Sequence, residues 1–187
     1  DFRNDAVDAA ELAAEEAGVA IYQVETLPAG KGELGEVSVR FRDAASGRLT
    51  LHVAVEAENA VTRSNDSRVH PGGALWFGTM GKHAETGAGA IYHLFKGKVT
   101  KLYPSISIPN AICFSPDNRH AYFADTARGM ICRQPLHPQS GWPKNPPQPF
   151  IDCGKEGVSP DGAVVDAQGN LWNAQWGASR VACYSDN

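Results

Sequence analysis

A pattern that recurs three times along the chain constrains its fold more than any other feature. Each copy is a short apolar strand, a polar turn and a strand that carries an aromatic residue, at residues 67–80, 111–125 and 163–176. When Pro71 is aligned with Pro116 and Ala167, the copies lie 45 and 51 residues apart, which is in the range of β-propeller blades. The chain is therefore predicted to be mainly β.

The repeats predict a partial β-propeller of about three four-stranded blades. Two more strands follow the first copy, with a turn at Lys96-Gly97, and two follow the second copy, whereas the third copy reaches residues 180–185 without an outermost strand. Residues 47–56 resemble the last strand of a preceding blade. Three blades do not close a ring. The chain is thus expected either to be a piece of a longer protein or to self-associate through exposed blade faces.

The first 45 residues differ in character from the rest. Residues 5–16 are rich in helix formers, with Asn4 or Asp5 able to cap the start and Gly18 able to end a helix. Residues 19–27 and 36–43 are β-rich runs joined by a turn-forming segment, which predicts a hairpin. The predicted organisation is a helix and β-hairpin segment of different origin at residues 1–45. A partial propeller that lacks its first and last blades follows at residues 46–187.

Composition narrows the class of protein. The 187 residues are 42% hydrophobic, enough for a buried core, and the net charge of -4 comes without the dense Lys/Arg cluster expected of a nucleic-acid-binding protein. No stretch approaches the roughly 18 consecutive apolar residues of a membrane helix. The amino terminus is charged where a signal peptide is apolar. We therefore predict a cytoplasmic protein with neither nucleic acid nor membrane as a partner.

Small polar residues precede the innermost strand of each repeat. They are Asn65, Asn110 and Asp161, and their separations of 45 and 51 residues equal the periods of the blades. Because equivalent positions face the central axis at one end of a propeller, these side chains are expected to converge. Amide and carboxylate oxygens suit a hard cation such as calcium, magnesium or manganese. Arg63 would place a guanidinium beside the same opening.

Two structural alternatives stand beside this hypothesis. Asn and Asp before a strand commonly serve as turn residues that bond their own backbone. Asp66 follows Asn65 and is a second candidate for the functional carboxylate, although a structural turn role is favoured. Trp76 and Trp172 occupy matching positions in the second strands and are predicted to be core residues rather than a platform for sugar.

The segments TRSNDSRVHPGGALWFGTMGK, SISIPNAICFSPD and SPDGAVVDAQGNLWNAQW resemble the gluconolactonase/regucalcin (senescence marker protein) family over about residues 48–186. The resemblance implies a six-bladed propeller with one divalent cation, calcium first, with zinc, manganese and magnesium as alternatives. It implies Asn110 and Asp161 as metal ligands, Arg63 and Asn65 as contacts of a sugar lactone, and Asp161 as the general base. The family's glutamate ligand has no counterpart here, so weak metal binding and little hydrolysis are expected. The alternative is a calcium-binding propeller fragment without catalysis.

Residues 1–45 show a shorter second resemblance, to a tail segment of von Willebrand factor A-containing bacterial proteins. It rests on FRNDAVDAAEL, AIYQVETLPAG and GELGEVSVRFRD. Together the two resemblances imply a fusion near residues 42–51, with an adhesive or interaction module as a third functional hypothesis.

Overall fold

The computed structural model describes residues 37–42 and 49–185, which form strands and two short 3-10 helices. No helix in these two ranges is long and apolar enough to cross a membrane. The helices are η1 (Thr126–Arg128) and η2 (Cys153–Glu156). The strands are β1 (Val37–Arg42), β2 (Leu49–Val55), β3 (Thr62–Val69), β4 (Leu75–Gly81), β5 (Gly89–Phe95), β6 (Lys98–Ile106), β7 (Pro109–Phe114), β8 (His120–Asp125), β9 (Met130–His137), β10 (Trp142–Pro143), β11 (Gln148–Asp152), β12 (Ser159–Val165), β13 (Leu171–Trp176) and β14 (Arg180–Tyr184).

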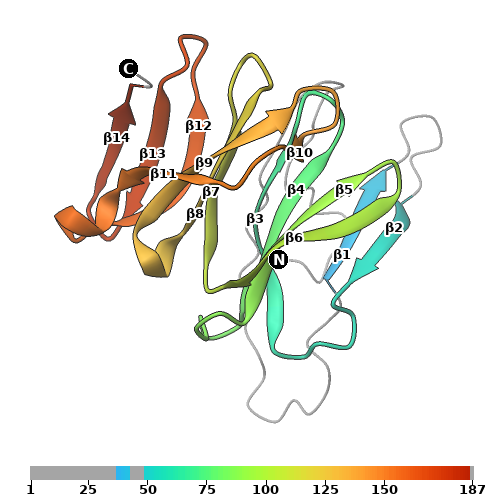
Figure 1. Ribbon diagram of the computed structural model, residues 1–187. Helices are drawn as coiled ribbons and strands as arrows, with labels where there is room; N and C mark the ends of the chain where they lie inside the picture. Colours follow the sequence, from blue (N-terminus) through green and yellow to red (C-terminus); the bar gives the residue numbers. More distant parts are fainter. Residues whose placement is uncertain (1–36, 43–48, 186–187) are drawn as a thin grey trace. The chain divides into compact units, whose positions relative to one another are not determined.

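The strands form successive antiparallel sheets, one for each repeat. The first sheet has the order β3-β4-β5-β6, the second contains β7, β8 and β9 with both β10 and β11 paired to β9, and the third has the order β12-β13-β14. Figure 1 shows the three sheets following one another along the sequence, from green to red. The expected blades are thus present, and the third sheet has three strands, as its sequence predicts.

Turn chemistry explains why the strands pair in this way. Phe95 pairs with Lys98, which leaves Lys96 and Gly97 as a two-residue loop. Both loop residues have positive φ, 49° and 77°, as a type I′ hairpin turn requires. The turn predicted at Lys96-Gly97 is confirmed.

Apolar side chains fill the spaces between neighbouring sheets. Between the first and second sheets they are Trp76, Ile91, Ile106, Ile112, Ala121, Phe123 and Leu136. Between the second and third sheets, Tyr122, Ala124 and Ile131 pack with Ala163 and Leu171, among others. On the other side of the first sheet, Phe77, Tyr92 and Leu94 pack with Val53 and Val55 of β2. Each blade therefore buries its faces against the blades beside it.

Only part of the segment predicted at residues 1–45 lies within the described residues. The helix predicted at residues 5–16 and the strand predicted at residues 19–27 lie outside the described residues. The β-rich run at residues 36–43 does form a strand, β1, and its described partner is β2. This antiparallel pair crosses the boundary predicted at residue 45, so the run preceding that boundary and residues 47–56 belong to one hairpin.

One core prediction is wrong. Trp76 is completely buried, whereas Trp172, at the matching position of the third sheet, is 42% exposed. The difference has a physical cause, because the second sheet covers Trp76, while no described strand packs over the corresponding face of the third sheet.

Candidate functional site

A β-bulge interrupts each inner strand near its beginning. The pairing register shifts between Ser64 and Ser67 in β3, between Asn110 and Cys113 in β7, and between Pro160 and Ala163 in β12. Bulges bend a strand and re-aim its side chains, and they are frequent beside active sites. In β7 the bulge holds Ala111 at a φ of 56°, a left-handed conformation that few residues other than glycine adopt. Asn65, Asn110 and Asp161 all lie within these bulges or at their edge.

Asn65 joins the first blade to the second. Its amide nitrogen donates to the carbonyl oxygen of Pro109 at 2.9 Å and to Asn110 Oδ1 at 3.3 Å. Its own Oδ1 accepts a 3.2 Å hydrogen bond from the guanidinium of Arg63, which also donates to the carbonyl oxygen of Ser64. Three of the four predicted site residues are therefore connected by direct hydrogen bonds.

Asn110 is connected to the third blade through a threonine. The Asn110 side chain is buried, and its Nδ2 donates to Thr126 Oγ1 at 2.8 Å. The Thr126 hydroxyl in turn donates to the carbonyl oxygen of Pro160 at 2.7 Å, next to Asp161 in sequence. Because Thr126 holds the amide nitrogen of Asn110, the amide oxygen of Asn110 is turned toward Asn65.

Asp66 and Arg68, both of β3, link the three inner strands β3, β7 and β12 through hydrogen bonds. Asp66 Oδ2 accepts a 2.7 Å hydrogen bond from the backbone N–H of Ile112. Arg68 donates to the carbonyl oxygen of Ile112 at 3.4 Å and to that of Ala163 at 3.1 Å, so one side chain of β3 reaches both β7 and β12. Burial raises the pKa of Asp66 to about 6, and the negative charge of Asp161 adds to the shift.

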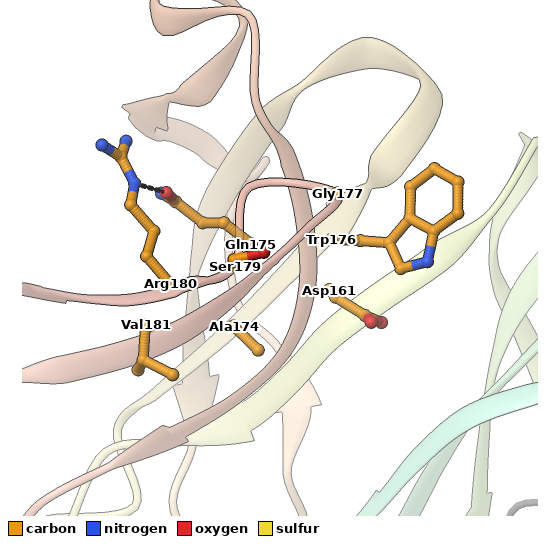
Figure 2. Close-up of a pocket in the computed structure, with 8 residues that line it drawn as sticks. All are labelled: Asp161, Ala174, Gln175, Trp176, Gly177, Ser179, Arg180 and Val181. Atoms are coloured by element: carbon orange, nitrogen blue, oxygen red, sulfur yellow. Dashed lines mark hydrogen bonds between the residues drawn. The ribbon is translucent and has the colours of Figure 1, made fainter.

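Asp161 stands at the edge of the cluster, and its carboxylate receives no hydrogen bond from the described residues. Its backbone carbonyl accepts a 3.0 Å bond from Asn173 Nδ2, which fixes the bulge rather than the carboxylate. Figure 2 shows the Asp161 side chain beside the indole of Trp176, at the rim of a shallow pocket that also includes Gln175 and Arg180. A carboxylate with unused acceptor capacity can take a cation or a proton.

The sequence matches the family model described as "SMP-30/Gluconolactonase/LRE-like region" over residues 8–187. The chain belongs to this family. Within the SMP-30/gluconolactonase family, the chain is similar to the calcium-binding protein regucalcin from Agrobacterium tumefaciens, a solved structure, with 52% sequence identity and a TM-score of 0.75. That comparison covers 79% of this chain and 50% of the other.

Curated relatives give the same picture. The L-arabinolactonase of Azospirillum brasilense is 37% identical, with 77% of this chain and 48% of the relative covered. Human regucalcin is 30% identical, with 68% and 44% covered. The chain therefore spans about half the length of the relatives it matches. The family match begins at residue 8 and includes most of the segment that carried the second resemblance, to von Willebrand factor A-containing proteins, which these comparisons do not show.

The residues of the cluster can be tested against the divalent cation that membership of the SMP-30/gluconolactonase family implies. Asn110 Oδ1 and the Asp161 carboxylate are oxygen donors, and oxygen is what calcium, magnesium and manganese prefer. Asn110 Oδ1 carries one long hydrogen bond and retains a second lone pair. In the described part of the chain, no three His, Cys, Asp or Glu residues gather into a metal-binding group. The donors thus fit a hard cation as part of its ligand set.

The sequence does not indicate one member of the cluster, Thr126, or the role of another, Asp66. Thr126 lies in η1, directly after β8. The sequence gives no signal for it, because its role depends on contacts with the starts of β7 and β12, which are distant from it in the sequence. For Asp66 the sequence favours a structural turn role over that of a functional carboxylate. In the structure it bonds across the blade boundary to a residue 46 positions away. Its immediate neighbour Asn65 was the available clue.

Proposed function

We propose that Arg63, Asn65, Asn110 and Asp161 form one site for divalent-cation-dependent hydrolysis of a sugar lactone. The observation that carries the proposal is the chain of hydrogen bonds that joins Asn65 to Asn110, and Asn110 through Thr126 to the residue before Asp161. Relatives named as lactonases support the reaction class. Because the chain spans about half their length, the activity of the whole protein is part of this proposal.

Asp161 is assigned to the proton transfer. The half-buried carboxylate has free lone pairs with which to accept a proton from a water molecule that attacks the lactone carbonyl carbon. The ring C–O bond then breaks, and the alkoxide that leaves takes up the proton, which gives the open sugar acid. A divalent cation bound by Asn110 and Asp161 would polarise the lactone carbonyl as a Lewis acid.

Arg63 and Asn65 are assigned to binding the lactone. Arg63 is exposed, and one of its nitrogens, Nη1, makes both of its hydrogen bonds, to Ser64 and Asn65. Its remaining guanidinium donors have no partner in the described part of the chain and can hold hydroxyl or carbonyl oxygens of a sugar. Asn65 Oδ1, held by Arg63, keeps one further lone pair for a hydroxyl group.

Calcium is the cation we propose, because the similar structure is described as a calcium-binding protein. The alternative function is calcium binding without catalysis. It rests on the same similarity to a protein described as calcium-binding and requires no proton transfer by Asp161. The different origin of residues 1–45 and the cytoplasmic location stay predictions from the sequence.

The test measures the rate of gluconolactone hydrolysis with and without calcium. The rate is monitored as acid release, after subtraction of the spontaneous rate. We expect slow, calcium-dependent turnover that is lost in Asp161→Asn and retained in Glu58→Gln. Glu58 is an exposed carboxylate that makes none of the hydrogen bonds of the cluster, so this control removes the same charge without removing a proposed ligand. Calcium binding without acid release would support the alternative. Equal turnover in Asp161→Asn and the unaltered chain would contradict the assignment of Asp161.

A further inference from the structure

Asn173 of β13 holds the two carbonyl groups at the centre of the β12 bulge. Its Nδ2 donates to the carbonyl oxygen of Asp161 at 3.0 Å and to that of Gly162 at 3.2 Å. The carbonyl groups directly before and after this pair accept hydrogen bonds from Thr126 at 2.7 Å and from Arg68 at 3.1 Å. Four consecutive carbonyl groups of the bulged strand are therefore fixed by side chains, and Asn173 fixes two of them.

The position of the Asp161 carboxylate depends on this backbone. The carboxylate itself receives no hydrogen bond from the described residues, so no donor among them fixes its place. A group that binds a cation or moves a proton has to be held within about 0.5 Å of its working position. The hydrogen bonds that Asn173 makes to the backbone of Asp161 and Gly162 are the direct means of holding it there.

Strand pairing shows which residues of the other blades are equivalent to Asn173. In each blade, one residue of the second strand pairs with the residue three positions after Asn65, Asn110 or Asp161. These pairs are Trp76 with Arg68, Tyr122 with Cys113 and Trp172 with Val164. The next residues on β4, β8 and β13 are Phe77, Phe123 and Asn173. A buried asparagine thus occupies a position at which the other two blades bury phenylalanine.

Asn173 is a poor choice for packing at this position. Its Oδ1 is buried and receives no hydrogen bond from the described part of the chain. On the same face of the sheet, its pairing partner Ala163 and the nearby Leu171 belong to an apolar cluster. A buried polar atom without a partner costs stability, whereas an apolar side chain gains it. Such a departure from the apolar pattern of a core is expected where function requires it.

We infer that Asn173 is a positioning residue, which holds the β12 bulge so that the Asp161 carboxylate faces the cation and the attacking water. The inference rests on the function proposed above for Asp161. Asn173 acts through the backbone, because its amide bonds to carbonyl groups and not to the carboxylate. Its amide therefore serves the site at the expense of the fold, and its replacement should affect the two in opposite directions.

Asn173→Leu tests the inference, because leucine keeps the branched shape and lacks the donor. We expect calcium affinity to be at least tenfold weaker by calorimetry and gluconolactone hydrolysis at least tenfold slower. The urea midpoint of unfolding should be unchanged or higher, since the buried Oδ1 is gone and water can reach the exposed Gly162. An unchanged calcium affinity, or a midpoint below that of the unaltered chain, would overturn the inference.

Leu171→Val is the matched control. Leu171 is completely buried in the same strand and on the same face, and it pairs with Val165 rather than with the bulge. Loss of a buried methylene group should give the reverse pattern, a lower urea midpoint with unchanged calcium affinity. If Leu171→Val weakens calcium binding as much as Asn173→Leu does, the effect is one of general packing and the inference fails.

Backbone NMR provides a readout that needs neither calcium nor turnover. The amide order parameter of Gly162 is expected near about 0.85 in the unaltered chain and in Leu171→Val, as in rigid backbone, and below about 0.6 in Asn173→Leu. Asn173→Ala, which removes the amide without adding methyl groups, should show the same fall. A Gly162 that is equally rigid in all four proteins would reject the role of Asn173. Absence of calcium binding and turnover from the unaltered chain would instead reject the function proposed for Asp161.

Discussion

The carboxylate of Asp66 accepts a 2.7 Å hydrogen bond from the backbone N–H of Ile112, and so joins the bulge of one blade to the bulge of the next. The bond fixes the strand immediately after Asn110. Asp66 is also close enough to Asp161 for the two charges to interact. Asp66 is thus a structural link between the residues assigned to the cation and those assigned to the lactone.

Asp66→Asn should change how stability depends on pH. Burial raises the pKa of Asp66 from 3.8 to about 6 in the folded chain, so folding favours its protonated form. This contribution to stability is fully present below pH 4 and is lost as the pH rises through 6. From the size of the shift, the loss over the whole titration amounts to about 3 kcal/mol, in order of magnitude. Urea unfolding at pH 4.5 and pH 7 measures it.

Asparagine has the size of aspartate and can still accept the Ile112 N–H, but it does not ionise. The free energy of unfolding of Asp66→Asn should therefore fall less than that of the unaltered chain between the two pH values. An equal fall in both proteins would mean that Asp66 does not titrate in this range.

Thr126→Val should weaken cation binding while the fold persists. The substitution removes the hydroxyl that holds Asn110 Nδ2 and that donates to the carbonyl oxygen of Pro160, at a cost of about 1–3 kcal/mol. The Asn110 amide then loses its fixed orientation. Calorimetric titration with calcium should show at least a tenfold weaker affinity.

Thr79→Val is the matched control for that substitution. Thr79 is buried, and its hydroxyl donates to Glu56 and accepts from the Ala90 N–H, so it bonds to no residue of the cluster. The control is expected to lose stability and keep the affinity for calcium. A similar loss of affinity in both variants would mean that Thr126 acts through stability alone.

Trp76→Phe and Trp172→Phe should differ in cost although the residues match in the repeat. In Trp76→Phe, the Gly141 carbonyl loses its buried donor and the ring leaves a void, so unfolding should become easier by about 2–4 kcal/mol. Trp172 is half exposed, so the same change should cost less than about 1 kcal/mol. Urea unfolding of dilute protein compares them, and equal costs would contradict the described burial.

Gly78→Ala should disturb the contact between the first two blades. A β-carbon at residue 78 would lie 2.3 Å from Pro109 Cγ, and Pro109 provides the carbonyl that Asn65 holds. Overpacking of this kind costs about 1–3 kcal/mol. Gly162→Ala, where a β-carbon meets nothing within 4 Å, is the stability control. If thermal unfolding shifts equally in both variants, the close approach of Gly78 to Pro109 is not a constraint.

The repeat made most of the described fold predictable. Strands and turns depend on residues that are close in the sequence. The strand around Trp76 and the turn at Lys96-Gly97 could therefore be predicted without knowledge of the neighbouring blades. The exposure of Trp172 could not, because burial depends on what covers a sheet and not on the residue itself.

The site was predictable only in part for the same reason. Asn65, Asn110 and Asp161 stand at one repeated position, which the spacing reveals. Thr126 and the role of Asp66 arise from contacts between blades, and such contacts leave no periodic trace in one sequence. The β-bulges that aim these side chains are likewise a property of strand pairing.

Calcium titration of the full chain by calorimetry tests the central claim most directly, with Asp161→Asn, Asn110→Ala and Glu58→Gln beside it. We expect weak binding, with a dissociation constant on the order of 10⁻⁴–10⁻³ M, near the weak end for protein calcium sites. That binding should survive in Glu58→Gln and disappear in Asp161→Asn and Asn110→Ala. Binding that is the same in all four proteins, or absent from the unaltered chain, would contradict the site.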